Sequence, residues 1–231
     1  MQKRQIAFYD IDKTSYDGFL VLDLATHQLQ NGIISEQCLT DMKTDIAQYR
    51  SGEIPYEQMA QNLLEHWAQG LLGKQINDVL VKSREFFETE GKKFFSYVQT
   101  SINLLSPTHD IYFVTAGPQF GAQYVADMHN ATGFISTIFE ERDGVFTGNI
   151  SKSLASKEKK KREIYPLLNT HNNAKSFAFG DSSNDVEMLE SVAYPICVNA
   201  DSELRKVAET NSWDICSPEQ VINTIQARLS E

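Results

Sequence analysis

The spacing of apolar positions changes twice along the chain. The first apolar run, residues 5–10, is short, ends in an aspartate and predicts a buried strand. From residue 17 to about residue 90 apolar positions recur at helical spacing, and glycine-containing breaks divide this stretch into three or four helices. The clearest repeat, at i, i+4, i+5 and i+8, is Met59, Leu63, Leu64 and Trp67.

Beyond residue 105, strand-like runs alternate with helical stretches up to the C-terminus. The predicted strands cover residues 110–115, 134–139, 176–180, 195–198 and 213–216. The predicted helices cover residues 119–128, 157–168 and 201–209, with another from 184 and a last one capped by Ser217. Asp143-Gly144 indicates a β-hairpin within this part. Such alternation is typical of a parallel sheet covered by helices on both faces.

The helical block interrupts the alternation directly after the first strand. We therefore predict an α/β fold, a doubly wound parallel (Rossmann-like) sheet with a helical cap inserted after the first strand. Residues 1–16 and 91–231 would form the α/β core, and residues 17–90 the cap.

Composition narrows the class of protein. The chain has 231 residues, 41% of them hydrophobic, and its 21 Lys+Arg against 31 Asp+Glu give a net charge of −10. This acidic balance disfavours a nucleic-acid partner. No apolar stretch reaches the roughly 18 residues of a membrane span, so no membrane partner is expected. The three cysteines are odd in number and far apart, which favours free thiols and a cytoplasmic location. They are Cys38, Cys197 and Cys216.

Polar residues follow three of the predicted strands at their carboxyl ends, where open α/β sheets bind ligands. The three segments are Asp10-Ile-Asp-Lys-Thr14, Thr115-Ala-Gly117 and Gly180-Asp-Ser-Ser-Asn-Asp185. Crowded, buried carboxylates have to be neutralised or bound to a metal. A hard divalent cation with oxygen ligands, Mg²⁺ above all, suits them best. The glycine motifs of P-loop and dinucleotide-binding proteins are absent from the sequence.

In this order, the three segments resemble the motifs of the haloacid dehalogenase (HAD) superfamily, in particular its phosphoserine-phosphatase-like branch. Asp143-Gly-Val-Phe-Thr-Gly148 is similar to a hairpin of that branch, and Pro195-Ile-Cys-Val-Asn199 fits a later strand. The resemblance covers about residues 1–16 and 100–231. Over the cap, the resemblance is limited to the position of the insert and its helical type.

The resemblance implies a Mg²⁺-dependent phosphatase that hydrolyses small-molecule phosphate monoesters through an aspartyl-phosphate intermediate. Asp10 would be the nucleophile, a covalent role open to a carboxylate. Asp12 would protonate the leaving alcohol and then deprotonate the hydrolytic water. Thr115, with the backbone amides of Ala116 and Gly117, would hold the phosphoryl oxygens.

The resemblance also implies a set of metal ligands. Asp10 and Asp181 would bind Mg²⁺ through their carboxylates, and Asp12 through its backbone carbonyl. Asp185 would act through a water molecule, and Asn184 would orient the phosphoryl group. Positioning and charge neutralisation are most of what phosphoryl transfer requires of a protein.

Members of the family carry a lysine that contacts both the nucleophile and the phosphate. The basic run 157–162 offers four candidates. We favour Lys161, because Ile164 follows it at the spacing common in the family, while Lys157 and Lys160 remain open. The other lysines of this run are expected on a solvated helix face.

The start of the cap bears on the substrate. Phosphoserine phosphatases hold the amino acid with a glutamate and an arginine of the cap, and Phe19 and Leu63 stand at those positions here, which disfavours phosphoserine. Tyr16, Asp17 and Phe19 follow Asp12 closely in the sequence. Two rings beside a carboxylate, with no cation nearby, favour a small cationic leaving group, as in phosphoethanolamine or phosphocholine. The alternative is that the two rings only pack the hinge between core and cap.

Two other functions share some of these features. A receiver-like phospho-acceptor signalling domain also joins Asp, Mg²⁺, Thr and Lys on a doubly wound fold. However, it is much shorter, has no helical insert after the first strand and is phosphorylated at the end of a later strand. An inactive HAD-like binding module is the second alternative, but all the motif positions are filled in this chain.

Overall fold

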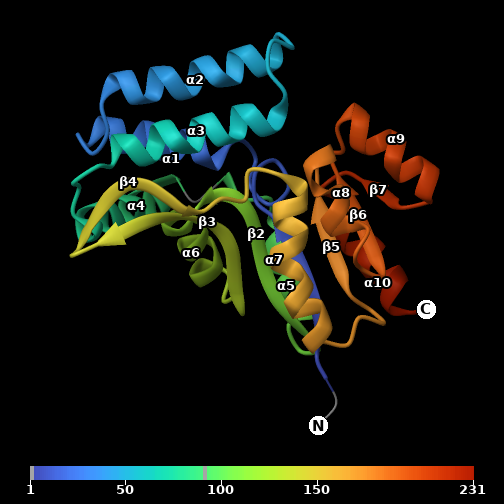
Figure 1. Ribbon diagram of the computed structural model, residues 1–231. Coiled ribbons are helices and arrows are strands. Elements are labelled where there is room, and N and C mark those ends of the chain that lie inside the picture. The colour runs from blue at the N-terminus through green and yellow to red at the C-terminus, as the bar shows by residue number, and fades with distance from the viewer. Residues whose placement is uncertain (1–2, 91–92) are drawn as a thin grey trace.

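The structure, a computed structural model, describes residues 3–90 and 93–231, and the described residues include one sheet flanked by helices (Figure 1). The strand order is β4-β3-β2-β1-β5-β6-β7, and all neighbours are parallel except β3 and β4. The strands are β1 (Gln5–Asp10), β2 (His109–Pro118), β3 (Gly133–Arg142), β4 (Val145–Lys152), β5 (Phe177–Gly180), β6 (Tyr194–Val198) and β7 (Asp214–Cys216). The predicted fold class, an α/β fold with a doubly wound parallel sheet, is confirmed.

Four of the described helices lie in the stretch after β1 that was predicted to form the cap. They are α1 (Leu20–Gln30), α2 (Glu36–Arg50), α3 (Tyr56–Gly70) and α4 (Ile76–Glu90). The predicted boundary at residue 91 lies outside the described residues. The later helices are α5 (Ser96–Leu105), α6 (Gln119–Met128), α7 (Lys157–Thr170), the 3-10 helix η2 (Ser183–Asp185), α8 (Val186–Leu189), α9 (Ser202–Asn211) and α10 (Val221–Leu229). Each helix within residues 3–90 and 93–231 is too short or too polar to cross a membrane.

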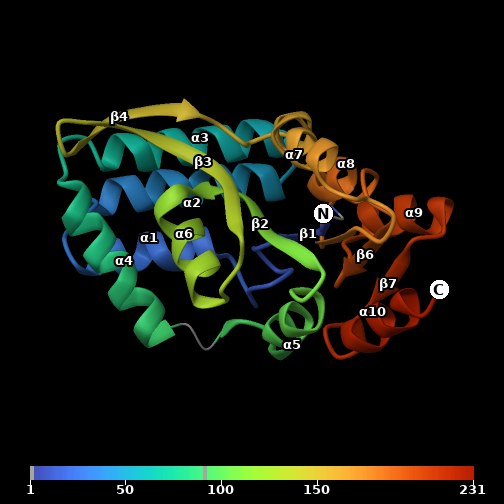
Figure 2. The same ribbon diagram turned by 90° about the horizontal axis from the view of Figure 1, so that it is seen from below.

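Strand β1 lies at the centre of the sheet, and its side chains alternate between two apolar cores. Ala7 and Tyr9 face the layer of α5, α6 and α10, whereas Ile6 and Phe8 face the layer of α7, α8 and α9 (Figure 2). All four side chains are fully buried. A strand covered on both faces needs apolar residues at every position, which explains the unbroken run after Gln5.

The core on the α6 side continues into the helical segment. The Trp67 ring of α3 is fully buried and meets the rings of Phe120 and Phe139 edge-on, at centroid distances of 5.4 and 6.2 Å. Its indole nitrogen donates to the side-chain oxygen of Gln28 at 2.8 Å. Helix α3 also lies along β4 (Figure 1), so the segment packs against the β3–β4 hairpin.

The two turn predictions have different outcomes. Asp143 and Gly144 both have positive φ, 52° and 82°, and join β3 to β4 as predicted. The prediction that Ser217 caps the last helix is wrong, because the helix begins only at Val221. The Ser217 hydroxyl donates to the Glu219 carboxylate, and residues 217–220 form a turn.

Candidate active site

Three strand ends converge at one edge of the sheet. Strand β1 pairs with β2 on one side and with β5 on the other, all parallel, and the chain changes direction across the sheet at this point. Asp10 is the last residue of β1, Gly180 is the last residue of β5, and Thr115 lies one position beyond the β2 residue that pairs with Asp10. The segments singled out in the sequence therefore meet at a topological switch point, the usual ligand site of such folds.

A cluster of three buried carboxylates occupies this edge. Asp10, Asp181 and Asp185 are 6%, 7% and 1% exposed. One oxygen of each lies within 4.8 Å of the others. Burial, and then the charge of Asp185, raise the pKa of Asp10 well above its usual value and that of Asp181 to about 8. A divalent cation would relieve this crowding, and carboxylate oxygens are its preferred ligands, so these residues fit Mg²⁺.

Asp185 is held in place by the turn that follows β5. Its Oδ2 accepts hydrogen bonds from the backbone N–H groups of Asp181 and Ser182, at 3.2 and 3.3 Å. Gly180 makes room for it, since a Cβ at that position would lie 2.5 Å from the Cβ of Asp185. The glycine of the Gly180-Asp181 pair is therefore required by close approach.

One lysine balances part of the negative charge. Lys160 of α7 is 4% exposed, and its Nζ donates to Oδ1 of Asp10 and Oδ1 of Asp185, each at 2.9 Å. Burial opposes its charged form, but the two carboxylates outweigh burial and raise the pKa of Lys160 well above its usual value. Lys160 is thus a permanent cation between two of the clustered carboxylates.

The expectation that Lys161 fills this position is wrong. Lys161 is exposed and forms an ion pair with Glu187 of α8. Helix α7 buries positions i, i+4 and i+8, namely Lys160, Ile164 and Leu168, because side chains four residues apart lie on one helix face. A spacing of three or four positions to Ile164 fits Lys161 and Lys160 alike, and only the buried face of α7 distinguishes the two lysines.

Asp12 lies two residues beyond Asp10, at the start of the helical segment. Its Oδ1 accepts a hydrogen bond from the backbone N–H of Leu20, the first residue of α1, at 2.6 Å. Burial raises the pKa of Asp12 to about 6, although this hydrogen bond opposes the rise. A carboxyl group with a pKa near neutrality can both give and take a proton under physiological conditions.

The other predicted phosphate-binding residues are close by. Ala116, Gly117 and Asn184 line the same cavity as Asp10. The Thr115 hydroxyl lies beside them, but it accepts the backbone N–H of Gly117 at 3.0 Å. In this structure the Gly117 amide is therefore engaged within the chain, and the expected amide cradle is only partly open.

The structure does not bring all the predicted cap residues to the site. Tyr16 is fully buried, and its hydroxyl donates to Asp23 at 2.8 Å. Asp17 is exposed and does not line the cavity. Phe19 does line it, but Lys13 Nζ lies 4.4 Å from the centre of its ring. The assumption that no cation lies nearby is wrong, so the argument for a cationic leaving group loses its basis.

Tyr56 and Arg50 are among the cavity residues that the sequence did not predict. Tyr56, the first residue of α3, lies near the clustered charges, and burial raises its pKa, while the charge of Lys160 opposes the rise. Arg50, at the end of α2, lines the cavity from the solvent side. Neither stands in a motif, and only the packing of α2 and α3 above the sheet brings them there.

Comparison with known proteins agrees with this geometry. Residues 7–190 match the family model of the haloacid dehalogenase-like hydrolases. The chain is 27% identical over 146 residues to phosphoserine phosphatase SerB1 of Mycobacterium tuberculosis (strain H37Rv), which covers 62% of the chain and 45% of that protein. The first curated relatives are thus matched over less than half of their own length.

Solved structures agree at the level of the fold. A Bordetella pertussis Tohama I protein of unknown function superposes with a TM-score of 0.79 and 23% identity, over 94% of this chain and all of that one. A phospho-aspartyl intermediate analogue of phosphoserine phosphatase superposes with a TM-score of 0.64 and 17% identity, over 94% of both chains. The chain belongs to the haloacid dehalogenase-like hydrolase family, and its fold is that of the phosphoserine-phosphatase-like branch.

Proposed function

We propose that this protein is a Mg²⁺-dependent phosphatase that hydrolyses small-molecule phosphate monoesters through an aspartyl-phosphate on Asp10. One observation carries the proposal. The Asp10 carboxylate contacts Lys160, belongs to a cluster of three buried carboxylates and lines a cavity of about 270 Å³. A buried carboxylate at the base of a cavity is placed to attack a bound phosphorus atom.

The proposed reaction has two steps. An oxygen of Asp10 attacks phosphorus, the bond from phosphorus to the ester oxygen breaks, and Asp12 gives a proton to the leaving alkoxide. A water molecule, deprotonated by Asp12, then attacks phosphorus, which releases inorganic phosphate and restores the Asp10 carboxylate. Lys160 holds Asp10 in position throughout.

The metal would be held by the carboxylates of Asp10 and Asp181 and the backbone carbonyl of Asp12, with Asp185 acting through water. When bound, Mg²⁺ supplies positive charge that neutralises the phosphoryl oxygens. Thr115, Ala116, Gly117 and Asn184 would complete the phosphate site. We further propose a cytoplasmic location, which is supported by three free, buried cysteines.

The test combines trapping of the covalent aspartyl-phosphate with measurement of phosphatase turnover. The wild-type protein should hydrolyse p-nitrophenyl phosphate with Mg²⁺, and rapid acid quenching should leave a hydroxylamine-sensitive phosphate on Asp10. Asp10→Asn should fold normally and fall below about 1% of wild-type activity, because an amide cannot attack phosphorus. Activity above about 10% in this variant would contradict a covalent mechanism.

A further inference from the structure

The cavity above Asp10 has two chemically different sides. Its base consists of charged and polar residues at the strand ends, including Asp10, Asp12, Lys160 and Asn184. The opposite wall comes from the helical segment and is mainly apolar, with Tyr49, Arg50 and Tyr56 as its polar members. Its apolar members include Phe19, Ile46, Met59, Ala60, Leu63 and Leu64.

Helix α3 supplies most of this wall. Met59 and Leu63 are four positions apart, as are Ala60 and Leu64, so the four side chains form one stripe along the helix. They are buried, with exposed fractions from 2% to 8%. A substrate whose phosphate reaches Asp10 therefore places the rest of its structure beside hydrocarbon.

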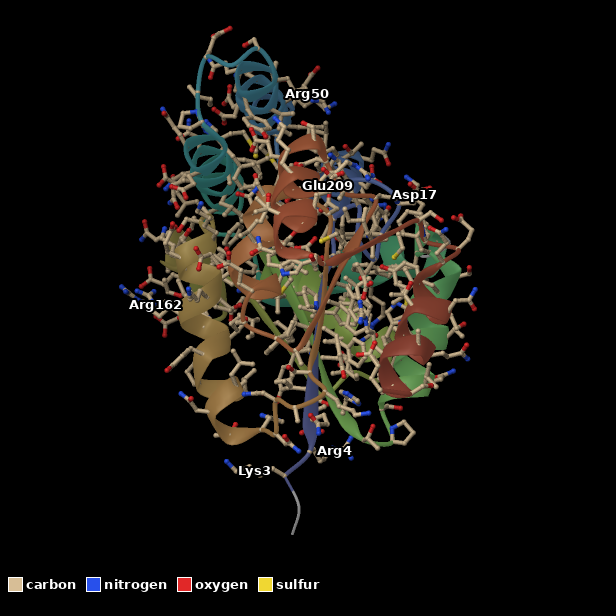
Figure 3. The ribbon with its side chains drawn as sticks, turned by 90° about the vertical axis from the view of Figure 1, so that its right-hand side faces the viewer. Lys3, Arg4, Asp17, Arg50, Arg162 and Glu209 are labelled. Atoms are coloured by element: carbon tan, nitrogen blue, oxygen red, sulfur yellow. The ribbon has the colours of Figure 1, made fainter. Side chains whose placement is uncertain are left out.

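The charged residues on this wall also bear on the kind of substrate that fits. Among the described residues of the helical segment, Arg50 is the only charged one that lines the cavity, and it is exposed. Asp17 lies on another part of the surface, well separated from Arg50 in Figure 3. The helical wall itself thus offers no carboxylate to an ammonium group, and Arg50 would repel one. Asp201 also lines the cavity, but it is exposed to solvent and belongs to the loop before α9.

We propose that the substrates of this site are phosphate monoesters of apolar alcohols, whose hydrocarbon part packs against α2 and α3. This inference rests on the proposed function. Burial of each methylene is expected to strengthen binding about fourfold. An ammonium or amino-acid group against the apolar stripe of α3 would lose water without gaining a partner, which disfavours binding.

The direct experiment compares alkyl phosphates that differ only in chain length. Ethyl, butyl and hexyl phosphate release alkoxides of similar basicity, so differences in kcat/KM report contacts with the wall. With Mg²⁺, kcat/KM should rise by about tenfold or more from ethyl to hexyl phosphate. Phosphoserine and phosphoethanolamine should fall about tenfold or more below butyl phosphate.

Two variants on α3 test whether the dependence on chain length arises at this wall. Met59→Gln keeps the length of the side chain and adds a polar amide to the wall, so the hexyl-to-ethyl ratio of kcat/KM should fall about fivefold. Glu65→Gln lies at an exposed position of the same helix and should leave the ratio unchanged. Because each ratio is measured within one protein, a loss of folded material cancels.

Binding of analogues that cannot be hydrolysed tests this inference independently of the proposed function. Hexylphosphonate and ethylphosphonate contain a carbon–phosphorus bond that phosphatases of this type do not cleave, and calorimetry with Mg²⁺ compares their affinities. If no ester is hydrolysed, the proposed function fails, and tighter binding of hexylphosphonate still supports the apolar site. A flat chain-length profile in turnover and binding, or a preference for phosphoserine or phosphoethanolamine, overturns the inference.

Discussion

The Nζ of Lys160 lies 2.9 Å from an oxygen of Asp10, although the two residues are 150 positions apart in the sequence. The same nitrogen donates to Asp185, so a single ammonium group joins the end of β1 to the turn after β5. Removal of this charge would leave Asp10 and Asp185 without the buried ammonium group that contacts both of them. Lys160 therefore has a role in stability as well as in the proposed chemistry.

The first prediction compares neighbouring lysines of α7. Lys160→Met should reduce kcat on p-nitrophenyl phosphate by about 100-fold or more, because Asp10 loses the group that orients it. It should also lower the free energy of unfolding of the metal-free protein by about 3–5 kcal/mol, as expected when one partner of a buried ion pair is removed. Steady-state kinetics and urea denaturation measure the two effects.

Lys161→Met is the matched control, since Lys161 is exposed and pairs with Glu187 rather than with the buried carboxylates. Its kcat and unfolding free energy should stay close to wild type, because surface ion pairs contribute about 0–1 kcal/mol. Equal losses of activity in the two variants would show that α7 matters for the fold alone.

The succession of strands along the chain and the residues at their ends were predictable from the sequence. A strand buried on both faces is a short apolar run, and such a run directly before Asp10 or Asp181 places those carboxylates at the carboxyl edge of the sheet. Local pattern was sufficient here because each carboxylate ends or directly follows the strand that positions it. The choice between Lys160 and Lys161 was not made correctly, because it depends on which face of α7 packs on the sheet.

The cavity wall could not be predicted in the same way. Tyr56 and Arg50 reach the site only because α2 and α3 pack above the strand ends, and that placement depends on contacts such as Trp67 against Phe120. The prediction that Tyr16 contacts the substrate failed for a related reason. Its position shortly after Asp12 suggested a role in binding, whereas its ring is fully buried in the core.

The second prediction concerns the metal. Chelation should abolish phosphatase activity, and added Mg²⁺ should restore it. Ca²⁺ should bind without supporting turnover, because it takes more ligands at longer distances and draws both oxygens of Asp10 away from attack. Full activity in excess chelator, or with Ca²⁺ alone, would contradict the proposed cofactor.

The third prediction uses stability to test the same carboxylates without turnover. The raised pKa of Asp181, about 8, means that its charged form is unfavourable in the metal-free protein at pH 7. Asp181→Asn should therefore raise Tm without metal and lose most of the increase that Mg²⁺ gives to wild type. Asp17→Asn, at an exposed position, should leave both Tm values unchanged. A Mg²⁺ response in Asp181→Asn equal to that of wild type would exclude Asp181 as a ligand.

The fourth prediction concerns the space at Gly180. Gly180→Ala should displace Asp185, because the new Cβ would lie 2.5 Å from the Cβ of that residue. Overpacking of this kind costs about 1–3 kcal/mol in unfolding free energy, and activity should fall about tenfold or more. Gly121→Ala is the control, since its Cβ would meet only the end of the Leu24 side chain at 3.3 Å. Wild-type kinetics in Gly180→Ala would show that Asp185 is not needed where the structure places it.

The last prediction concerns acid sensitivity at His129. This side chain is 5% exposed, its Nδ1 bonds to Oε1 of Gln99 at 2.9 Å, and its buried Nε2 has no hydrogen-bond partner among the described residues. Burial lowers the pKa of His129 to about 4, against an ordinary value near 6.5.

The direction of the pH effect on stability follows from proton binding to the folded and unfolded chain. Between pH 6.5 and 4 the unfolded chain takes up a proton on His129 that the folded chain does not, so the folded state loses stability as the pH falls through this range. The loss is on the order of 3 kcal/mol once both states are charged. His129→Gln removes this contribution, and because wild type and variant share all other titrating groups, the difference between their unfolding free energies isolates it. Urea denaturation at pH 7.5 and pH 4.5 should show a smaller pH-dependent loss in the variant; equal losses in the two proteins would mean that His129 is protonated without cost inside the folded core.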